Sequence, residues 1–314
     1  MLGDFWTGLG GRLADRWVAA LFSPAFGFWA AGLLAWAQRP QNGGWPDRLL
    51  ALGRQLQGMP LLIQGSYLLA LLVVITLSGL ALRRIAQPAL RVLAGYWPAR
   101  LNRAAARLRA RLSDRSDRDR AQLRQLAASP RDELNPAQIA ERSRLERRLR
   151  RIPAQRAARM PTRLGNVLQA GEARTRNRYG LDPLVCWPRL WLLLPDTARQ
   201  EVTAAYTSLL LAVQVLICGL LFTVWTIWAW WALPAGLLVA VAAYARTLAA
   251  AAAFADLLES CFDLYRPLLY QALRWPPASD PGAERTSGVR LSTYLHAGSR
   301  QPEPVFVAGP DQQR

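Results

Sequence analysis

The chain contains 44 consecutive residues without a charged side chain, from Val202 to Ala245. A hydrocarbon core of ~30 Å is crossed by a helix of ~20 apolar residues, because each residue adds about 1.5 Å. The run is therefore long enough for two crossings, and it predicts a membrane hairpin. Pro234 and the tryptophans before it indicate the turn, since indole rings prefer the headgroup level and proline ends a helix. We place the two spans at 207–229 and 235–256.

Two further apolar stretches precede the hairpin, one within 16–39 and one within 54–83, the latter with its apolar centre at 61–82. The first also carries the tripeptide AWA at 35–37, which is typical of a signal-peptidase site. Its apolar length exceeds a usual signal core of ~7 to 15 residues, so we interpret it as an uncleaved anchor. The predicted fold class is all-α, a polytopic membrane protein with four transmembrane helices.

Arginine is distributed unevenly, with 27 Arg against 11 Asp and Glu in 83–201, but only three Arg and one Asp in 39–58. The positive-inside rule then places the large Arg-rich block, between spans two and three, in the cytosol together with both termini. We expect a bacterial inner-membrane protein. Its predicted domains are a pair of transmembrane helices at 1–82, a basic helical cytosolic domain at 83–201, a transmembrane hairpin with a cytosolic helix extension at 202–274, and a disordered tail at 275–314.

The first part of the basic domain, 98–157, has the pattern of a helical hairpin. Apolar residues recur at steps of three and four from Leu101 to Leu112, with arginine on the other faces. Asn135 and Pro136 then have the residue types of a helix N-cap and first helical position. The hairpin has few large apolar residues, so we expect it to need the rest of the domain, another subunit or a membrane surface.

The second part, 159–201, has clear signals for helix ends. Thr162 can cap a helix that runs to Tyr179, and Gly180 can close it in a left-handed conformation. Asp182 begins the next turn. The apolar ridge that follows, with its tryptophans, predicts an element lying at the membrane interface. The predicted interfacial anchors are Trp187 and Trp191 in this ridge, and Trp228, Trp230 and Trp231 near the hairpin turn.

The order PTRLGN, Glu172, RYGLD, WPRLW and LLPD in this part resembles a recurring block in uncharacterised multi-spanning bacterial membrane proteins. The resemblance covers about 40 residues and the flanking topology. It implies a shared fold. No activity or binding residue comes with it.

The residue types exclude several kinds of chemistry. All 39 basic residues are arginine, so a Schiff-base or P-loop lysine is excluded, and the one histidine and three scattered cysteines predict no metal centre and no triad. Arg163, Asn166, Glu172 and Asp182 are polar candidates for acid–base work. The alternative is that they are caps, turn formers and surface groups. We therefore expect no catalytic residue and no cofactor.

Arg246 is anomalous, because it lies about ten to twelve residues into the fourth predicted span, near the bilayer middle. An arginine there costs at least ~2.5 kcal/mol, so it normally faces a polar interior. Its possible partners are Gln214, Gln64, Tyr67, a backbone carbonyl or an acidic group of another subunit. Alternatively, the span is shifted and Arg246 extends toward an interface.

Asp256, Glu259 and Asp263 recur at steps of three and four, so they share one face of the helix that continues the fourth span. This acidic stripe can draw cations to a pore, or it can bind the Arg-rich helices.

The expected partners follow from charge. Anionic lipid headgroups attract arginines at the membrane surface, and a protein partner or a homo-oligomer is also open. Nucleic acid is disfavoured, since 98–178 has no aromatic residue to stack on bases. The function predicted is a non-enzymatic anchor, scaffold or sensor that self-associates. The first alternative is a channel or membrane-permeabilising effector that uses Arg246. The second is a membrane enzyme.

Overall fold

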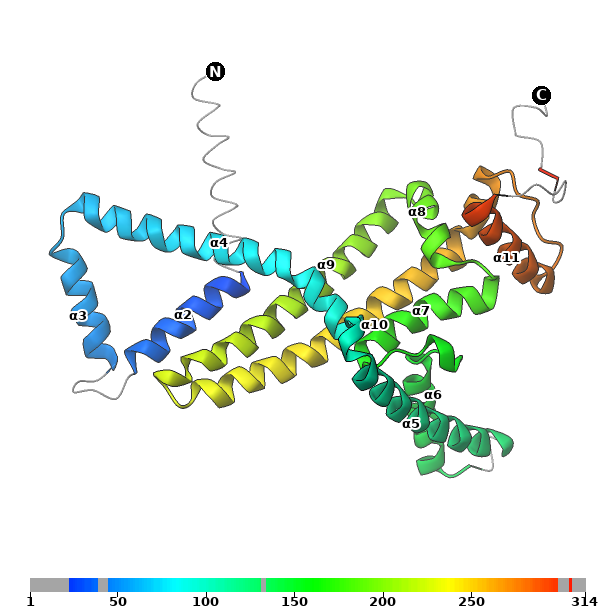
Figure 1. The fold of residues 1–314 in the computed structure, drawn as a ribbon, viewed down its shortest axis with the longest axis horizontal. Coiled ribbons are helices and arrows are strands. Elements are labelled where there is room, and N and C mark those ends of the chain that lie inside the picture. The colour runs from blue at the N-terminus through cyan, green and yellow to red at the C-terminus, as the bar shows by residue number, and fades with distance from the viewer. Residues whose placement is uncertain (1–22, 39–44, 131–133, 299–304, 307–314) are drawn as a thin grey trace, which may run out of the picture. The chain divides into compact units, whose positions relative to one another are not determined.

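The computed structural model describes residues 23–38, 45–130, 134–298 and 305–306 (Figure 1). All secondary structure within these ranges is helical, in agreement with the predicted all-α class. The elements are α2 (Pro24–Ala37), α3 (Trp45–Gln57), α4 (Leu61–Ala94), η1 (Ala99–Leu101), α5 (Asn102–Ala128), α6 (Pro136–Arg150), η2 (Arg156–Ala158), α7 (Arg163–Tyr179), α8 (Pro183–Leu193), α9 (Asp196–Phe222), η3 (Thr223–Ile227), α10 (Ala232–Ala272) and α11 (Pro281–Ala297).

Three helical stretches in the described ranges are long and apolar enough to cross a membrane: Leu61–Ala128, which includes α4, Asp196–Ile227, which includes α9, and α10. This composition supports a membrane protein with three candidate spans. The helix α2 is apolar but has 14 residues, about 21 Å at 1.5 Å per residue. The preceding part of the predicted first span lies outside the described residues.

The chain divides into two compact units. The apolar unit consists of Met1–Leu90 and Leu210–Thr247, and the basic unit consists of Arg91–Leu209 and Leu248–Arg314. This division differs from the domains expected from sequence. The second half of α10 and all of α11 belong with the Arg-rich helices, because their side chains form that unit's core.

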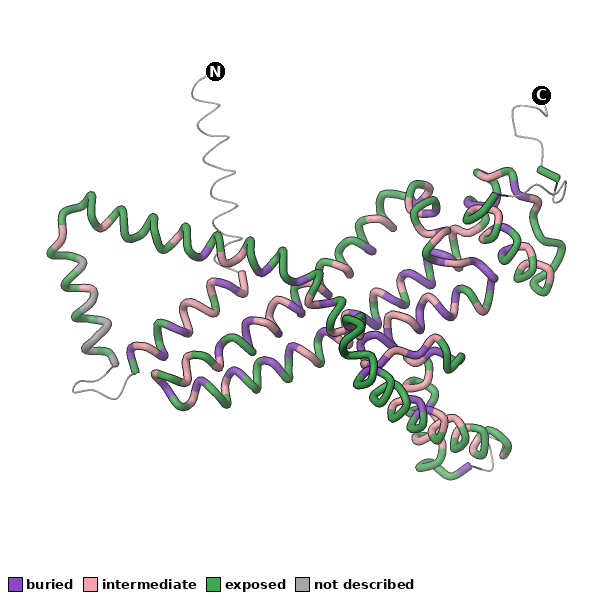
Figure 2. The backbone as a smooth tube through the Cα atoms, in the orientation of Figure 1, coloured by how far each residue is buried: buried purple, intermediate pink, exposed green. Residues whose placement is uncertain are grey.

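Small residues and aromatic rings hold the apolar unit together. The Trp29 indole N–H donates to Ser78 Oγ on α4 at 3.1 Å. A Cβ on Gly32 would lie 2.6 Å from the Trp225 ring, so glycine lets α2 approach η3. The outer face of α4 stays uncovered, with Leu62 88% exposed (Figure 2). Such a face suits contact with lipid chains.

The turn of the apolar hairpin lies earlier than the sequence predicts. The helix α9 ends at Phe222, η3 follows, and α10 begins at Ala232. Pro234 is therefore in the first turn of α10 instead of between the spans. A proline is tolerated there because the first N–H groups of a helix have no partner within the helix.

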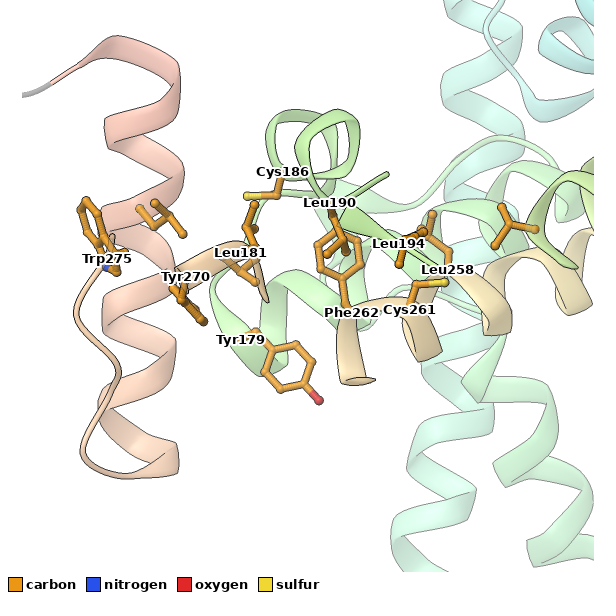
Figure 3. Packing of buried hydrophobic residues seen from close by; sticks show 13 residues of the cluster. Tyr179, Leu181, Cys186, Leu190, Leu194, Leu258, Cys261, Phe262, Tyr270 and Trp275 are labelled. Atoms are coloured by element: carbon orange, nitrogen blue, oxygen red, sulfur yellow. The ribbon is translucent and has the colours of Figure 1, made fainter. Parts of the chain in front are cut away.

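The core of the basic unit forms where α8, α10 and α11 meet (Figure 3). Leu190 of α8, Phe262 and Leu269 of α10 and Leu291 of α11 are completely buried in it. The core places a fixed set of helices beside the Arg-rich hairpin.

The ridge predicted to lie at a membrane interface is part of this core. Trp187 packs on Phe262 with ring centroids 6.0 Å apart, and Trp191 also packs against the buried cluster. The large apolar side chains of α8 that are exposed are Leu184 and Leu192, at 72% and 76%. The ridge is apolar because it packs on α10.

The tail also differs from its prediction, because 281–297 forms the helix α11. Asp280 caps this helix by accepting hydrogen bonds from the backbone N–H groups of Gly282 and Ala283, both at 2.8 Å. Gly288 then lets α11 approach α7, since a Cβ there would lie 1.9 Å from the Tyr179 carbonyl oxygen. Packing with a distant part of the chain therefore orders a segment of low hydrophobicity.

Candidate functional site

The helices α5 and α6 form the predicted hairpin, and α6 has a well-formed N-terminal cap. Asn135 caps α6 in a capping box: its Oδ1 accepts from the Gln138 backbone N–H at 2.8 Å, and the Gln138 side chain accepts from the Asn135 backbone N–H at 2.9 Å. Pro136 occupies the first helical position. These local signals are the ones that the sequence displayed.

Arg159 joins α5 to the segment that follows α6, from a buried position with its side chain 4% exposed. Its guanidinium donates to the carbonyl oxygens of Ser113 (3.2 Å), Pro153 (3.3 Å) and Ala154 (3.3 Å), and to Asp117 Oδ1 (2.7 Å). The bond from Arg159 holds the pKa of the Asp117 carboxyl below its ordinary value. A buried charge requires such full pairing, so Arg159 holds the segment that follows α6 on α5.

Asn166 fixes the segment that enters α7. Its Oδ1 accepts from the Met160 backbone N–H at 2.9 Å, and its Nδ2 donates to the carbonyls of Met160 (2.9 Å) and Thr162 (2.8 Å). Thr162 caps the helix by accepting from the Gly165 N–H at 3.0 Å. Both Asn166 amide hydrogens are thus used within the chain. Its role is to position the start of α7.

A cavity of about 520 Å³ lies against the hairpin and α7 in the basic unit. It has the size of a small-molecule site. None of the described carboxylates lines its wall. Seven arginines do: Arg115, Arg144, Arg147, Arg148, Arg151, Arg159 and Arg163. The apolar part of the wall comes from Leu112, Ile152, Val167 and Leu248. The cavity therefore favours a ligand that is both anionic and partly apolar.

Three of the seven arginines already have carboxylate partners. Arg159 pairs with Asp117 as above, Arg148 with Asp119 at 3.1 Å, and Arg144 with Glu141 at 3.8 Å. Among the described residues, the other four form no ion pair: Arg115, Arg147, Arg151 and Arg163. Arg163 is also the first residue of α7, where the positive end of a helix adds to the field. This excess of positive charge can be neutralised by an anion.

The acidic stripe on α10 is paired with arginines of α6 and α7. Arg174 Nε donates to Glu259 Oε2 at 2.6 Å, and its Nη2 donates to Asp256 Oδ1 at 2.8 Å. Arg150, at the end of α6, approaches the same two carboxylates at 3.7 and 3.8 Å. Within the described ranges, no group of three His, Cys, Asp or Glu is placed to hold a metal ion.

Arg178 and Tyr179 extend this network by one helical turn. Arg178 lies 3.2 Å from Asp263, and the Tyr179 hydroxyl donates to Asp263 Oδ1 at 2.6 Å. Arg266 lies over the Tyr179 ring, 4.1 Å from its centroid, and pairs with Glu284 of α11 at 2.6 Å. The carboxylates of the stripe thus hold α6 and α7 on α10, and α11 is attached at its end.

Gly180 ends α7 in the left-handed conformation, with φ at 70°, as the sequence predicts. Asp182 then caps α8 by accepting from the Leu184 N–H at 3.1 Å, and it also accepts from Arg176 at 2.8 Å. These interactions are those of a cap and a turn former.

Glu172 has a separate environment, in a small cavity of about 140 Å³ that Tyr96 and Phe254 also line. Burial raises the pKa of its carboxyl above the ordinary value, while Arg176 and a 3.1 Å hydrogen bond from Gln169 oppose the shift. Burial, together with the Glu172 charge, also raises the pKa of Tyr96. No hydrogen bond joins the Glu172 and Asp182 carboxyls, although Arg176 interacts with both of them.

The polar residues of the predicted spans are not brought together. Arg246 is exposed and, within the described ranges, has no hydrogen bond or ion pair. Gln64 donates to the Met59 carbonyl at 2.9 Å, Tyr67 is 57% exposed, and Gln214 is half-buried on α9. None of the three partners Arg246 in the described chain.

The tryptophans of the hairpin turn differ in exposure. Trp230 is 80% exposed, as suits an anchor at headgroup level. Trp228 packs on Trp225 with centroids 4.9 Å apart, and Trp231 packs on Phe222 at 6.0 Å. These two also hold the turn together.

No protein-family model, no curated protein and no solved structure matches the chain. The resemblance to uncharacterised membrane proteins therefore stays a prediction.

The cavity is the feature that sequence reasoning missed. Its arginines come from α5, α6, α7 and the segment between α6 and α7, and their positions relative to one another depend on how the hairpin folds onto α7. A signal was present in Arg147 and Arg148, which lie four and three residues before Arg151, the spacings at which side chains on a helix are neighbours. Only the contacts show that Arg115 and Arg163 join them.

Proposed function

We propose that the chain is a non-enzymatic bacterial inner-membrane protein that acts as an anchor, scaffold or sensor by binding anionic lipid headgroups. In this proposal it has four spans, and its basic unit lies on the cytosolic side with both termini. The observation that carries the proposal is the Arg-lined cavity, in which four arginines have no carboxylate partner among the described residues. Each arginine near an anionic surface contributes about 1 kcal/mol of attraction.

The position of the cavity along the chain supports this function. Leu248 lines the cavity, and it is the first residue of α10 that belongs to the basic unit. Arg246 lies 14 residues after the first residue of α10, about 21 Å along a helix. In a core of ~30 Å it is then closer to the inner boundary than to the outer one. Its exposed guanidinium can reach headgroups there, which favours the interfacial interpretation over a pore.

Binding of anionic lipid tests the function. The full-length chain in a mild detergent is mixed with phosphatidylglycerol or with phosphatidylcholine, and retained lipid is counted by native mass spectrometry. We expect retained phosphatidylglycerol and a higher melting temperature in its presence. Equal retention of the two lipids would refute a headgroup-binding role.

Topology and self-association have tests of their own. Protease added outside intact spheroplasts should spare the loop that joins α5 and α6. Cleavage of this loop would show that the basic unit lies on the outer side of the membrane. Crosslinking in native membranes should give dimers or larger species. A chain that yields only monomer and no partner would contradict the scaffold role.

A further inference from the structure

The four arginines of the cavity without carboxylate partners come from three places in the basic unit. Arg147 and Arg151 lie four residues apart on one face of α6 and its C-terminal end, while Arg115 comes from α5 and Arg163 from the start of α7. A phosphodiester carries one negative charge, and its two free oxygens suit the planar fork of arginine. Four arginines without carboxylates therefore match two phosphodiesters better than one.

The size and the apolar wall of the cavity point to an amphiphile. A volume of about 520 Å³ exceeds what one phosphate fills. Leu112, Ile152 and Leu248 would lose favourable contacts beside a small, fully hydrated anion. They suit a glycerol backbone or the start of an acyl chain. Leu248 belongs to α10, one of the described helices that are long and apolar enough to cross a membrane.

We propose that this cavity binds one lipid whose headgroup carries two phosphodiesters, with one phosphodiester on Arg147 and Arg151 and the other on Arg115 and Arg163. The inference rests on the proposed function and names the lipid class that it serves. It differs from general attraction to an anionic surface, because it requires two phosphates on one molecule and a defined set of arginines.

The experiment uses the full-length chain in detergent and three probes: cardiolipin, phosphatidylglycerol at twice the molar concentration, and inorganic pyrophosphate. Affinity is measured by native mass spectrometry and by the shift in melting temperature. The variant R147Q/R151Q removes one pair of arginines. Its matched control is R107Q/R109Q, which removes two exposed arginines of α5 outside the cavity. Circular dichroism verifies that each variant is helical.

Wild-type protein should bind cardiolipin in preference to both other probes. R147Q/R151Q should weaken cardiolipin binding at least about tenfold, since charge-assisted hydrogen bonds to both oxygens of one phosphate are lost. R107Q/R109Q should leave it within about twofold. If R147Q/R151Q fails to fold, R115Q/R163Q removes the other pair and should give the same loss.

Three results would overturn the inference. Equal binding of phosphatidylglycerol would remove the requirement for two phosphates, and equal binding of pyrophosphate would remove the requirement for a lipid. Equal losses in the cavity and control variants would place binding on the general basic surface. The first and third results leave the proposed function standing. The proposed function itself fails if no anionic lipid binds more tightly than phosphatidylcholine.

Discussion

Replacing Arg174 by methionine should release α7 and α6 from α10. The guanidinium donates to Glu259 (2.6 Å), to Asp256 (2.8 Å) and to the carbonyl oxygen of Arg150 at the end of α6 (2.6 Å). Methionine keeps most of the side-chain length and packing but removes all three hydrogen bonds. The variant therefore tests the charge and not the volume.

The expected cost follows from the burial of the partners. Glu259 is 7% exposed at its side chain, and Arg174 is 22% exposed. Breaking a buried ion pair from one side costs ~3–5 kcal/mol, because the remaining charge stays desolvated. Two other arginines soften this loss: Arg178 lies 3.6 Å and Arg150 lies 3.8 Å from Glu259, though both are more than half exposed. We expect about 3 kcal/mol, the lower end of the range.

A matched control separates burial from mere pairing. Arg199 also contacts a carboxylate at 2.6 Å, that of Asp196, but the carboxylate is 84% exposed. Exposed pairs contribute about 0–1 kcal/mol, so Arg199→Met should cost much less than Arg174→Met. The double variant Arg174→Met/Glu259→Gln should be destabilised by at least about 1 kcal/mol less than the sum of the two single variants, because the two residues share one interaction.

Hydrogen exchange of the α7 amides in detergent is the most direct assay, because it reports local opening. A loss of about 3 kcal/mol lowers protection roughly 100-fold, and the effect should persist in salt, since partly buried pairs are screened weakly. The reasoning is refuted if Arg174→Met and Arg199→Met lower α7 protection equally.

Three further predictions address other parts of the chain. Gly288→Ala places a Cβ 1.9 Å from the Tyr179 carbonyl oxygen, so α11 should detach at a cost of ~1–3 kcal/mol, and trypsin should cleave the C-terminal region several times faster than in the exposed-site control Thr286→Ala. Burial raises the pKa of Glu172 above 4.5, so its protonated form favours the fold, and stability should fall as pH rises from 4.5 through the raised value. Glu172→Gln should remove that fall and raise the melting temperature at pH 8; an unchanged pH profile would contradict the assignment. The wild-type chain in planar bilayers should show no conductance that depends on Arg246. A conductance that is present in wild type and lost in Arg246→Leu would instead support a pore.

The parts of the fold that the sequence predicts are those set by near neighbours. The caps at Asn135 and Thr162 and the closing Gly180 each depend on residues within four positions, and the structure has all three. The apolar helices follow from length and composition alone. Their number does not, because α2 is short within the described residues.

The parts that the sequence does not predict depend on distant packing. Residues 281–297 have the composition of a disordered tail, yet α11 is held by Gly288 and the buried Leu291 against helices that precede it by about 100 residues. The Asp280-Pro281 pair was a local signal for this helix. The tryptophan ridge of α8 packs on α10, and in a sequence an apolar face has the same appearance whether lipid or another helix covers it. The interfacial role of Trp187 and Trp191 stays a prediction.

The end of α6 contributes residues to the Arg-lined cavity and to the ion pairs with the acidic stripe of α10. Ligand binding in the cavity can therefore affect those ion pairs. Arg147 and Arg151 line the cavity. The side chain of Arg150 approaches Glu259, and the carbonyl oxygen of Arg150 accepts a hydrogen bond from Arg174. A ligand that orders this turn should therefore favour the ion pairs on α10. Because coupling between two equilibria is reciprocal, Arg174→Met should weaken lipid binding by the factor by which lipid strengthens the ion-pair network. Equal lipid affinity in wild type and Arg174→Met would show that the cavity binds without transmitting, and a sensor role would then be wrong while an anchor role remained.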